Sequence, residues 1–189
     1  MEIRPARKAD SAMAIPLILQ ANGDIAATLT GSDQMPEILQ IMTSFFEGDE
    51  NRLSYQNTLV AEEDGHAVGI LILYHGSQAA VLDRPLIERL RRLKQDPSLT
   101  LDKEADENEW YIDTLSVSPT YAGRGIATAL IAAAEERVRH GDGEARIALL
   151  VDKDNYRAYR LYQHLNYQQD KVVQLYQHPF LHMVKDLYK

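Results

Sequence analysis

The chain of 189 residues contains no cysteine. Disulfides, thiolate metal sites and a cysteine nucleophile are therefore excluded, and the absence fits a cytoplasmic protein, which is the location we expect. Histidine occurs six times, but at no spacing that indicates metal ligation. We therefore expect no metal, and we interpret His164, His178 and His182 as surface or packing residues.

Long apolar runs and an excess of positive charge are also absent. The longest apolar stretch, Ala67 to Tyr74, is too short to cross a bilayer, and no signal-peptide pattern follows Met1. The 20 basic residues are outnumbered by 28 acidic ones, which gives a net charge of -8. Because nucleic acids bind basic surfaces, we expect neither a nucleic-acid partner nor a membrane. An acidic surface attracts a cationic substrate such as an amine, although the charge can equally serve solubility alone.

The composition is that of an ordinary soluble protein with one hydrophobic core. Hydrophobic residues make up 45% of the chain and charged residues 25%, and the length fits one domain, residues 1–189, better than two. A first helix is predicted to be capped by Asp10 or Ser11, with Pro16 delaying its start or kinking it. A second is predicted to be capped by Ser32 or Asp33.

The remaining pattern alternates strands and helices. Asp64-Gly65 predicts a tight hairpin turn between two β-rich runs. Strands are predicted over residues 2–6, 58–62, 67–74, 110–117, 145–151, 172–175 and 181–184, and further helices over 80–97, 126–139 and 155–165. The helix ending at residue 139 is expected to stop at His140-Gly141-Asp142-Gly143. This order predicts an α/β or α+β fold.

Residues 78–109 make a long connection between the hairpin and the next strand, and we interpret them as an insertion. The acidic run over 102–107 is expected to be a solvated loop. The predicted helix of the insertion carries four leucines on one face, namely Leu82, Leu86, Leu90 and Leu93.

A glycine-bearing turn lies between the strand ending at Val117 and the helix starting at Ile126. Small residues at 123, 125 and 127 let an anion approach the backbone N–H groups of the first helical turn, where the helix dipole adds positive charge. Arg124 either adds charge to the same phosphates or lies in solvent. The turn is neither a Walker loop nor a dinucleotide fingerprint, because no Gly-Lys-Ser/Thr follows and Thr128 stands where the third glycine belongs.

The residues around this turn resemble the coenzyme A site of the GNAT N-acetyltransferase superfamily. In that family a strand ending in Leu-x-Val-x-Pro leads to Gln/Arg-x-x-Gly-x-Gly/Ala and a helix. Here the strand reads Leu115-x-Val117-x-Pro119 and the turn runs over residues 122–127, with Ala122 in place of the first motif residue. The resemblance implies a mixed central β-sheet flanked by helices, with acetyl-CoA as cosubstrate. It also implies that the backbones of Leu115 and Val117 bind the pantetheine arm and that residues 123–128 hold the pyrophosphate.

A second motif stands where the family places one. GNAT enzymes commonly show Asn-x-x-Ala-x-x-Leu-Tyr-x-x-x-Gly-Phe, and residues 155–167 match it, with Asn166 replacing glycine and Tyr167 replacing phenylalanine. Asn155 and Tyr162 lie two helical turns apart on one face, where each could also be a cap or a core aromatic. The resemblance implies that Asn155 contacts the coenzyme and that the Tyr162 hydroxyl protonates the departing thiolate. The implied coenzyme-binding residues are Leu115, Ser116, Val117, Gly123, Arg124, Gly125, Ile126, Ala127, Thr128, Asn155 and Tyr162.

An amine acceptor is protonated at neutral pH, so attack on a thioester needs a proton acceptor. Leu150 stands where many family members have a glutamate, which leaves Asp113 as the candidate base, in a strand otherwise poor in charge. A structural role for Asp113, bonded to a backbone group or an arginine, is an equal alternative. Tyr111, two residues away on the same strand face, is expected to line the acceptor site.

The sequence thus predicts transfer of an acetyl group from acetyl-CoA to a primary amine of a small molecule or peptide, by direct attack in a ternary complex. We expect the helix of the insertion to pack beside the acceptor cleft. Two alternatives stay open: a non-catalytic acyl-CoA sensor, and an acyltransferase that uses another acyl chain or a hydroxyl acceptor. The identity of the amine and the formation of a homodimer are not determined by the sequence.

Overall fold

The fold is organised around a sheet of seven strands in the order β1-β2-β3-β4-β5-β7-β6. The computed structural model describes residues 1–141 and 145–188, so two residues of the predicted helix stop, 142 and 143, lie outside the described residues. Neighbouring strands are antiparallel except β4 and β5, which are parallel. The strands are β1 (Glu2–Pro5), β2 (Thr58–Glu63), β3 (His66–His75), β4 (Trp110–Val117), β5 (Arg146–Asp152), β6 (Gln168–Leu175) and β7 (His178–Asp186).

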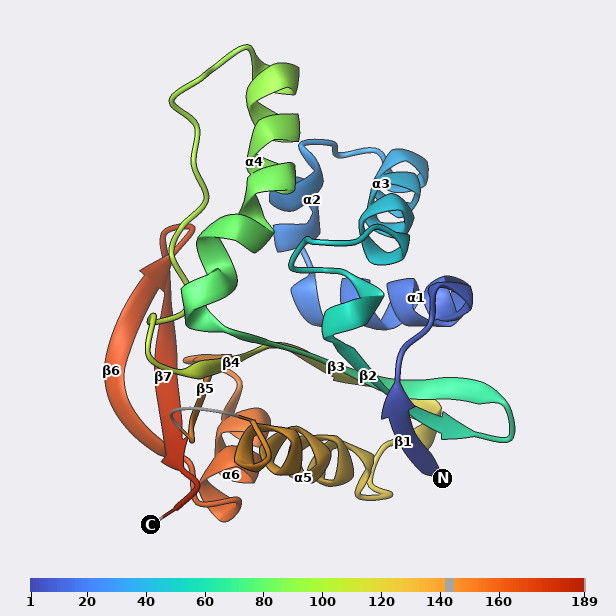
Figure 1. Cartoon of the computed structure of the whole chain (residues 1–189), viewed down its shortest axis with the longest axis vertical. Helices are drawn as coiled ribbons and strands as arrows, with labels where there is room; N and C mark the ends of the chain where they lie inside the picture. Colours follow the sequence, from blue (N-terminus) through green and yellow to red (C-terminus); the bar gives the residue numbers. More distant parts are fainter. Residues whose placement is uncertain (142–144, 189) are drawn as a thin grey trace.

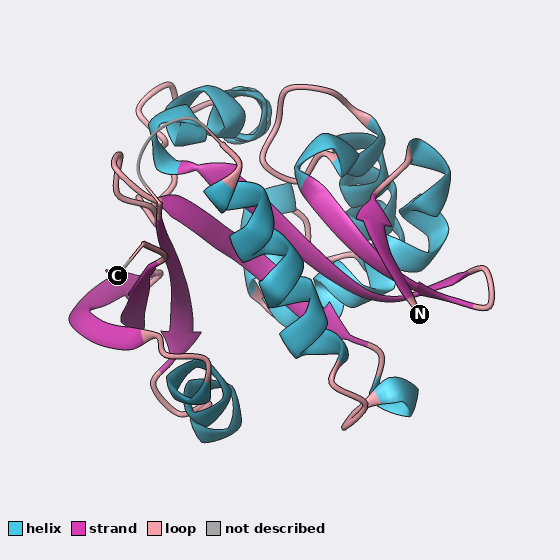
Figure 2. Ribbon diagram, turned by 60° about the horizontal axis from the view of Figure 1, so that its bottom comes forward, coloured by secondary structure: helices cyan, strands magenta, loops and turns pink. Residues whose placement is uncertain are grey.

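Helices cover both faces of the sheet (Figure 1). One face carries four helices and one hydrophobic cluster, and the other carries α5, α6 and a second cluster. A turned view places α5 across the middle of the strands (Figure 2). The helices are α1 (Ser11–Asn22), α2 (Ile25–Thr30), α3 (Met35–Glu47), α4 (Ala79–Lys94), α5 (Ile126–Arg139) and α6 (Tyr156–His164). Among the described residues, none of the helices combines the length and the apolar character needed to cross a membrane.

The parallel pair β4 and β5 is joined only at one end. Trp110, Tyr111 and Ile112 pair with residues 147–149 of β5, and no partner on β5 follows for the rest of β4. Beyond Ile112 the two strands part, while β5 continues to pair with β7 up to Asp152. The parting leaves one backbone edge of β4 open in the middle of the sheet.

Most local predictions are confirmed. The bounds predicted for β4 and α5 agree with the structure, and Asp64 and Gly65 form the hairpin turn with φ values of 52° and 78°. The helix α1 begins at Ser11 although Pro16 lies inside it, so the delayed start was wrong. The second predicted helix, α3, begins at Met35 with Gln34 as its N-cap, one to two residues later than the predicted cap.

Three predictions need correction. The short helix α2 was not predicted at all. Leu93 is 46% exposed, so only three leucines of α4 face the core. The acidic run is not a fully solvated loop, because Ala105 is buried and the Glu104 side chain is only 13% exposed. The structure folds this run back against the sheet, which is a tertiary effect that a charged local sequence does not reveal.

Candidate active site

A cleft of about 900 Å³ opens where β4 and β5 part. The open edge of β4, the end of β5 and the starts of α5 and α6 form one side, and α1, α2 and the β6–β7 turn complete it. Every residue that the sequence predicted for the site except Arg124 lines this cleft, namely Tyr111, Asp113, Leu115, Ser116, Val117, Gly123, Gly125, Ile126, Ala127, Thr128, Asn155 and Tyr162.

The open edge of β4 presents backbone groups to the cleft. Ser118 donates its N–H to Val68 O on β3 at 2.8 Å. Because backbone groups alternate sides along a strand, Leu115 and Val117 direct theirs away from β3, toward the gap. Gln20 of α1, which the sequence did not single out, donates to Val117 O and to Ser116 Oγ, both at 3.0 Å. Part of this edge is therefore already bonded to α1.

The glycine turn at the start of α5 has the geometry of an anion site. Gly123 and Gly125 adopt φ values of 79° and 77°, and a Cβ built on either would meet no heavy atom within 4 Å. The space beside the first helical turn is thus open, and the N–H groups and dipole of α5 give it positive potential. Arg124 lies at the rim, half exposed, with its guanidinium near Glu63 and 4.8 Å from the Tyr121 ring centroid.

Two residues of the second motif take different positions at α6. The Asn155 side chain accepts the N–H of Ala158 at 3.1 Å and so caps the helix. Tyr162 is buried, 8% exposed, and packs at 6.0 Å from the ring of Tyr167. Burial raises the pKa of Tyr162 to about 12, so its hydroxyl keeps its proton throughout the neutral range.

Asp113 occupies a β-bulge. Ile112 pairs with Leu73 of β3 and Thr114 pairs with Ile72, which leaves Asp113 without a partner in the register. Bulges re-aim side chains and are common next to active sites. The Asp113 carboxylate is turned into a polar cluster, where it contacts the guanidinium of Arg52 and accepts hydrogen bonds from the Thr114 hydroxyl at 3.0 Å and, more weakly, from the Tyr74 hydroxyl at 3.4 Å.

Arg52 is the centre of this cluster, and no sequence pattern indicated it. Its side chain is 3% exposed and contacts three carboxylates, those of Asp113, Glu104 at 2.8 Å and Asp83 at 3.4 Å. Burial raises the pKa of Glu104, and the nearby charge of Asp113 adds to this, although Arg52 opposes it. Burial likewise raises the pKa of Asp83. Tyr111 donates its hydroxyl to Glu104 at 3.0 Å.

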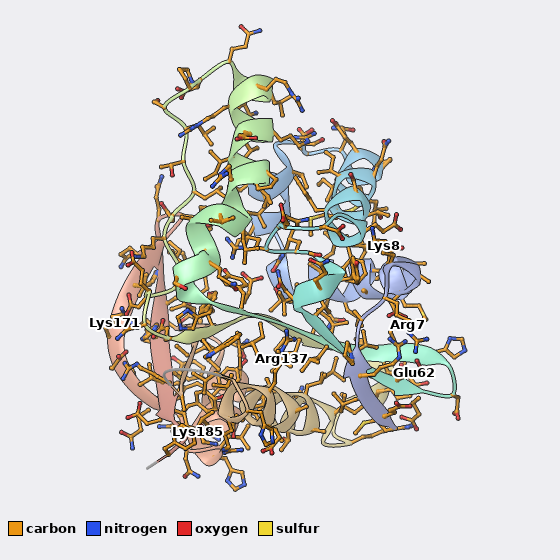
Figure 3. All side chains as sticks on the ribbon, viewed as in Figure 1. Arg7, Lys8, Glu62, Arg137, Lys171 and Lys185 are labelled. Atoms are coloured by element: carbon orange, nitrogen blue, oxygen red, sulfur yellow. The ribbon has the colours of Figure 1, made fainter. Side chains whose placement is uncertain are left out.

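The loop that carries Glu104 is pinned on both sides. Asp102 accepts the N–H of Tyr176 in the β6–β7 turn at 2.7 Å. Lys171, labelled on β6 in Figure 3, donates to Asp106 at 2.5 Å. Gly76 donates its N–H to Glu109 O at 2.8 Å, and a Cβ there would stand 1.7 Å from Asp106 O, so only glycine permits this crossing.

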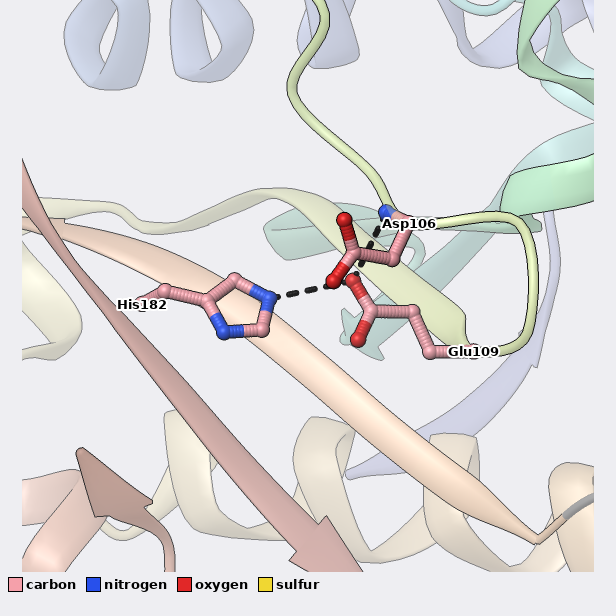
Figure 4. A group of neighbouring side chains, drawn as sticks. All are labelled: Asp106, Glu109 and His182. Atoms are coloured by element: carbon pink, nitrogen blue, oxygen red, sulfur yellow. Dashed lines mark hydrogen bonds and ion pairs between the residues drawn. The ribbon is translucent and has the colours of Figure 1, made fainter. Parts of the chain in front are cut away.

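The lower end of the loop is held by a buried histidine, His182 (Figure 4). Its Nε2 lies 3.0 Å from Glu109, its Nδ1 lies 2.6 Å from Asp170, and the N–H of Asp106 also donates to Glu109 at 3.0 Å. Burial alone would lower the pKa of His182, but the bonds to Glu109 and Asp170 outweigh it and raise that pKa. His182 is thus a packing residue, as expected, and also anchors the loop through charge.

The comparisons with known proteins agree with this architecture. Residues 28–167 match the Acetyltransferase (GNAT) family, which is most of the chain, and the protein therefore belongs to that family. A solved acetyltransferase is 27% identical, with a TM-score of 0.80 over 99% of this chain and 100% of its own. An N-acetyltransferase from Staphylococcus aureus Mu50 is 26% identical, with a TM-score of 0.82 over 98% of this chain and 100% of its own.

A more distant structure, an aminoglycoside acetyltransferase in complex with coenzyme A, is 17% identical with a TM-score of 0.60 and covers 97% of this chain and 93% of its own. At this identity the likeness concerns the fold. A search of curated protein sequences gave no match. The predicted fold class and family are thereby confirmed, while the roles of the individual site residues stay predictions.

Proposed function

We propose that the protein transfers the acetyl group of acetyl-CoA to a primary amine of a small molecule or peptide, by direct attack in a ternary complex. The observation that carries the proposal is the parting of β4 from β5 after Ile112. An open strand edge, the glycine turn at the start of α5 and the buried hydroxyl of Tyr162 therefore share one cleft with a cluster of carboxylates.

Each part of the cleft fits one part of acetyl-CoA. The open turn at Gly123 and Gly125 suits the pyrophosphate, because an anion can approach backbone N–H groups there at short range. The edge at Leu115 and Val117 offers hydrogen bonds to the amide groups of the pantetheine arm, as an added strand would use them. Val117 O now accepts a hydrogen bond from Gln20, and the pantetheine arm would replace Gln20 as the donor if it used that carbonyl.

The chemistry follows from the two ends of the cleft. An amine arrives as an ammonium ion and must lose a proton to a carboxylate before its nitrogen can attack. Two carboxylates, those of Asp113 and Glu104, line the acceptor end of the cleft. Tyr111 lines it too and donates a hydrogen bond to Glu104. Tyr162 donates its hydroxyl proton to the sulfur as the C–S bond breaks, and its high pKa ensures that the proton is present.

Thiol release from acetyl-CoA tests this function directly. We expect wild-type protein to release free thiol only when a primary amine is added, for at least one member of a broad amine panel. Acetyl-CoA should raise the melting temperature more than acyl-CoA esters with longer chains do. Binding of acetyl-CoA without thiol release for any amine would favour the sensor alternative, and release with alcohols alone would favour a hydroxyl acceptor.

Tyr162→Phe should lower kcat by about 10²–10⁴-fold with little change in acetyl-CoA affinity, because only the proton donor is removed from a buried ring. Tyr159→Phe is the matched control on the same helix, since the Tyr159 hydroxyl only accepts a bond from Gln163 at the surface. Steady-state kinetics and calorimetric titration of acetyl-CoA provide the two readouts. Equal kcat values in the two variants would remove Tyr162 from the mechanism.

A further inference from the structure

Two carboxylates, not one, face the acceptor end of the cleft, and their surroundings differ. Asp113 is 4% exposed and is engaged by the Arg52 guanidinium, the Thr114 hydroxyl and the Tyr74 hydroxyl. Both of its oxygens therefore already accept hydrogen bonds. Two of these bonds, from Arg52 and Tyr74, meet at one oxygen, and the low exposure leaves little of the Asp113 carboxylate open to a molecule in the cleft.

The Glu104 carboxylate is bonded by two donor side chains, whereas that of Asp113 is bonded by three, and the Glu104 side chain is more exposed. Its Oε1 lies 2.8 Å from Arg52 Nη2 and its Oε2 accepts the Tyr111 hydroxyl at 3.0 Å, while its side chain keeps 13% of its surface exposed. It lines the cleft from the loop between α4 and β4, whereas Asp113 lines the cleft from β4 itself. Each Glu104 oxygen accepts only one of these bonds, so each keeps a lone pair that can receive a proton from a molecule in the cleft.

Two buried polar groups near Glu104 have no hydrogen-bond partner within residues 1–141 and 145–188. The Tyr176 hydroxyl, from the β6–β7 turn, is buried and has no hydrogen-bond partner among the described residues. Tyr176 lines the same cleft, and its pKa is raised by burial first and then by the charge of Glu104, which places the two groups in electrostatic reach. The Nε of Arg52 is likewise buried without a partner in the described part of the chain. A polar acceptor bound here would satisfy such groups.

We propose that Glu104 is the catalytic base that removes the proton of the acceptor ammonium, and that Asp113 and Arg52 are positioning residues that hold it. The inference rests on the proposed acetyl transfer and assigns a step of it. Burial and the charge of Asp113 keep the pKa of Glu104 above its usual range, which brings a carboxylate closer to the neutral pH at which a base is most effective.

The protons balance as follows. Glu104 takes the first proton from the ammonium and releases it to solvent. The neutral nitrogen then attacks the carbonyl carbon, so the C–N bond forms and the C–S bond breaks. The second nitrogen proton replaces the one that Tyr162 gives to the sulfur. One amide, one thiol and one free proton result.

The groups that set the protonation of Glu104 come from every element around it. Arg52 precedes β2, Asp83 lies on α4, and Asp113 and Tyr111 lie on β4. Two more tyrosines, Tyr74 of β3 and Tyr176 of the β6–β7 turn, interact electrostatically with the same carboxylate. Among these groups Arg52 lowers the pKa of Glu104 and Asp113 raises it, so changing either one should move the titration in a known direction.

The test compares pH profiles of kcat/KM for wild type, Glu104→Gln and Asp113→Asn, with an amine that the wild type accepts. In wild type the rate should rise with pH through the pKa of Glu104 and then level. In Glu104→Gln we expect a rate about a hundredfold or more lower at neutral pH. That rate should climb tenfold per pH unit without levelling until the amine itself loses its proton near its pKa of about 10. Glu104→Asp should recover part of the loss and restore the levelling.

The Asp113→Asn variant distinguishes the roles of the two carboxylates. Removal of the Asp113 charge withdraws a negative neighbour and frees Arg52 for Glu104, so both effects lower the pKa of Glu104. The rise of kcat/KM with pH, which is the acidic limb of the profile, should therefore still be present but should occur at lower pH. Melting-temperature shifts with acetyl-CoA check that the coenzyme site of each variant is intact. If Glu104→Gln does not fold, the Asp113→Asn profile tests the inference on its own. A shift of the acidic limb to lower pH supports Glu104 as the base, and loss of the limb contradicts it.

The inference and the proposed function fail in different ways. Wild-type protein that releases no thiol with any amine would overturn the function and the inference with it. Turnover by wild type together with an unchanged rate and limb in Glu104→Gln would overturn the inference alone. A limb that vanishes in Asp113→Asn and survives in Glu104→Gln would assign the base to Asp113.

Discussion

Gly125→Asp should weaken acetyl-CoA binding by about a hundredfold or more, which corresponds to roughly 3 kcal/mol. Gly125 is the residue just before α5 and adopts a φ of 77°, with no heavy atom within 4 Å of the place of a Cβ. The free protein therefore has space for the new side chain. That same space is where we place the pyrophosphate, so the carboxylate both occupies it and repels the anion.

The chain supplies a matched control for this substitution. Gly65, in the β2–β3 turn, adopts a φ of 78° and also has no heavy atom within 4 Å of a built Cβ. Aspartate tolerates this backbone conformation, and Asp64 adopts it here with a φ of 52°. Gly65→Asp should therefore cost similar backbone strain and leave acetyl-CoA binding unchanged.

Calorimetric titration of acetyl-CoA and a denaturation curve for each variant give the two readouts. The expected outcome is a similar loss of stability in both variants and a loss of affinity in Gly125→Asp alone. Higher salt should reduce the difference in affinity, because part of it is charge repulsion. Equal affinities in the two variants would place the pyrophosphate away from the start of α5.

Local sequence patterns were sufficient for the coenzyme side of the cleft. β4 is a β-prone run that stops before a proline, and α5 is alanine-rich and follows glycines, so their bounds could be predicted from neighbouring residues. The phosphate turn lies between them, and its geometry follows from glycines at positive φ. These features depend on contacts within a few residues along the chain.

The acceptor side could not be predicted in the same way. Glu104 stands in a run of charged residues that is typical of a solvated loop, and it is largely covered because it pairs with Arg52, far away in the sequence. The bulge at Asp113 is a matter of register between two strands, which β-propensity does not encode. The sequence indicates Asp113 as a charge in an apolar strand, but it does not identify Arg52 as its partner.

Arg52→Met should lower the free energy of unfolding by about 3–5 kcal/mol, which is the usual cost of removing one partner from a buried ion pair. Arg52 is 3% exposed and contacts Asp83, Glu104 and Asp113, whose side chains are 15%, 13% and 4% exposed. Without the guanidinium these carboxylates repel one another in a site with little water. Methionine fills a similar volume, so the loss reflects charge more than packing.

The loss should depend on pH in a defined direction. Removing Arg52 raises the folded-state pKa values of Glu104 and Asp83 further above their unfolded values of about 4. A group whose pKa is raised on folding stabilises the fold below its unfolded pKa and loses that contribution as pH rises through the folded value. The variant should therefore be closest to wild type at or below about pH 4, and the difference should grow as the pH rises toward neutral.

Urea denaturation at several pH values measures this difference, with Arg139→Met as the control. Arg139 is a partly exposed arginine that pairs with the exposed Glu136 and with Glu135, which Lys185 also binds, so its loss leaves Glu135 paired and should cost at most about 1 kcal/mol. Adding Asp113→Asn to Arg52→Met should recover part of the lost stability, because one uncompensated charge disappears, and the double-mutant cycle gives the coupling between the two residues. If Arg52→Met costs no more than Arg139→Met, or if its cost is flat with pH, the carboxylates beside Arg52 are solvated. Glu104 would then have no environment that raises its pKa.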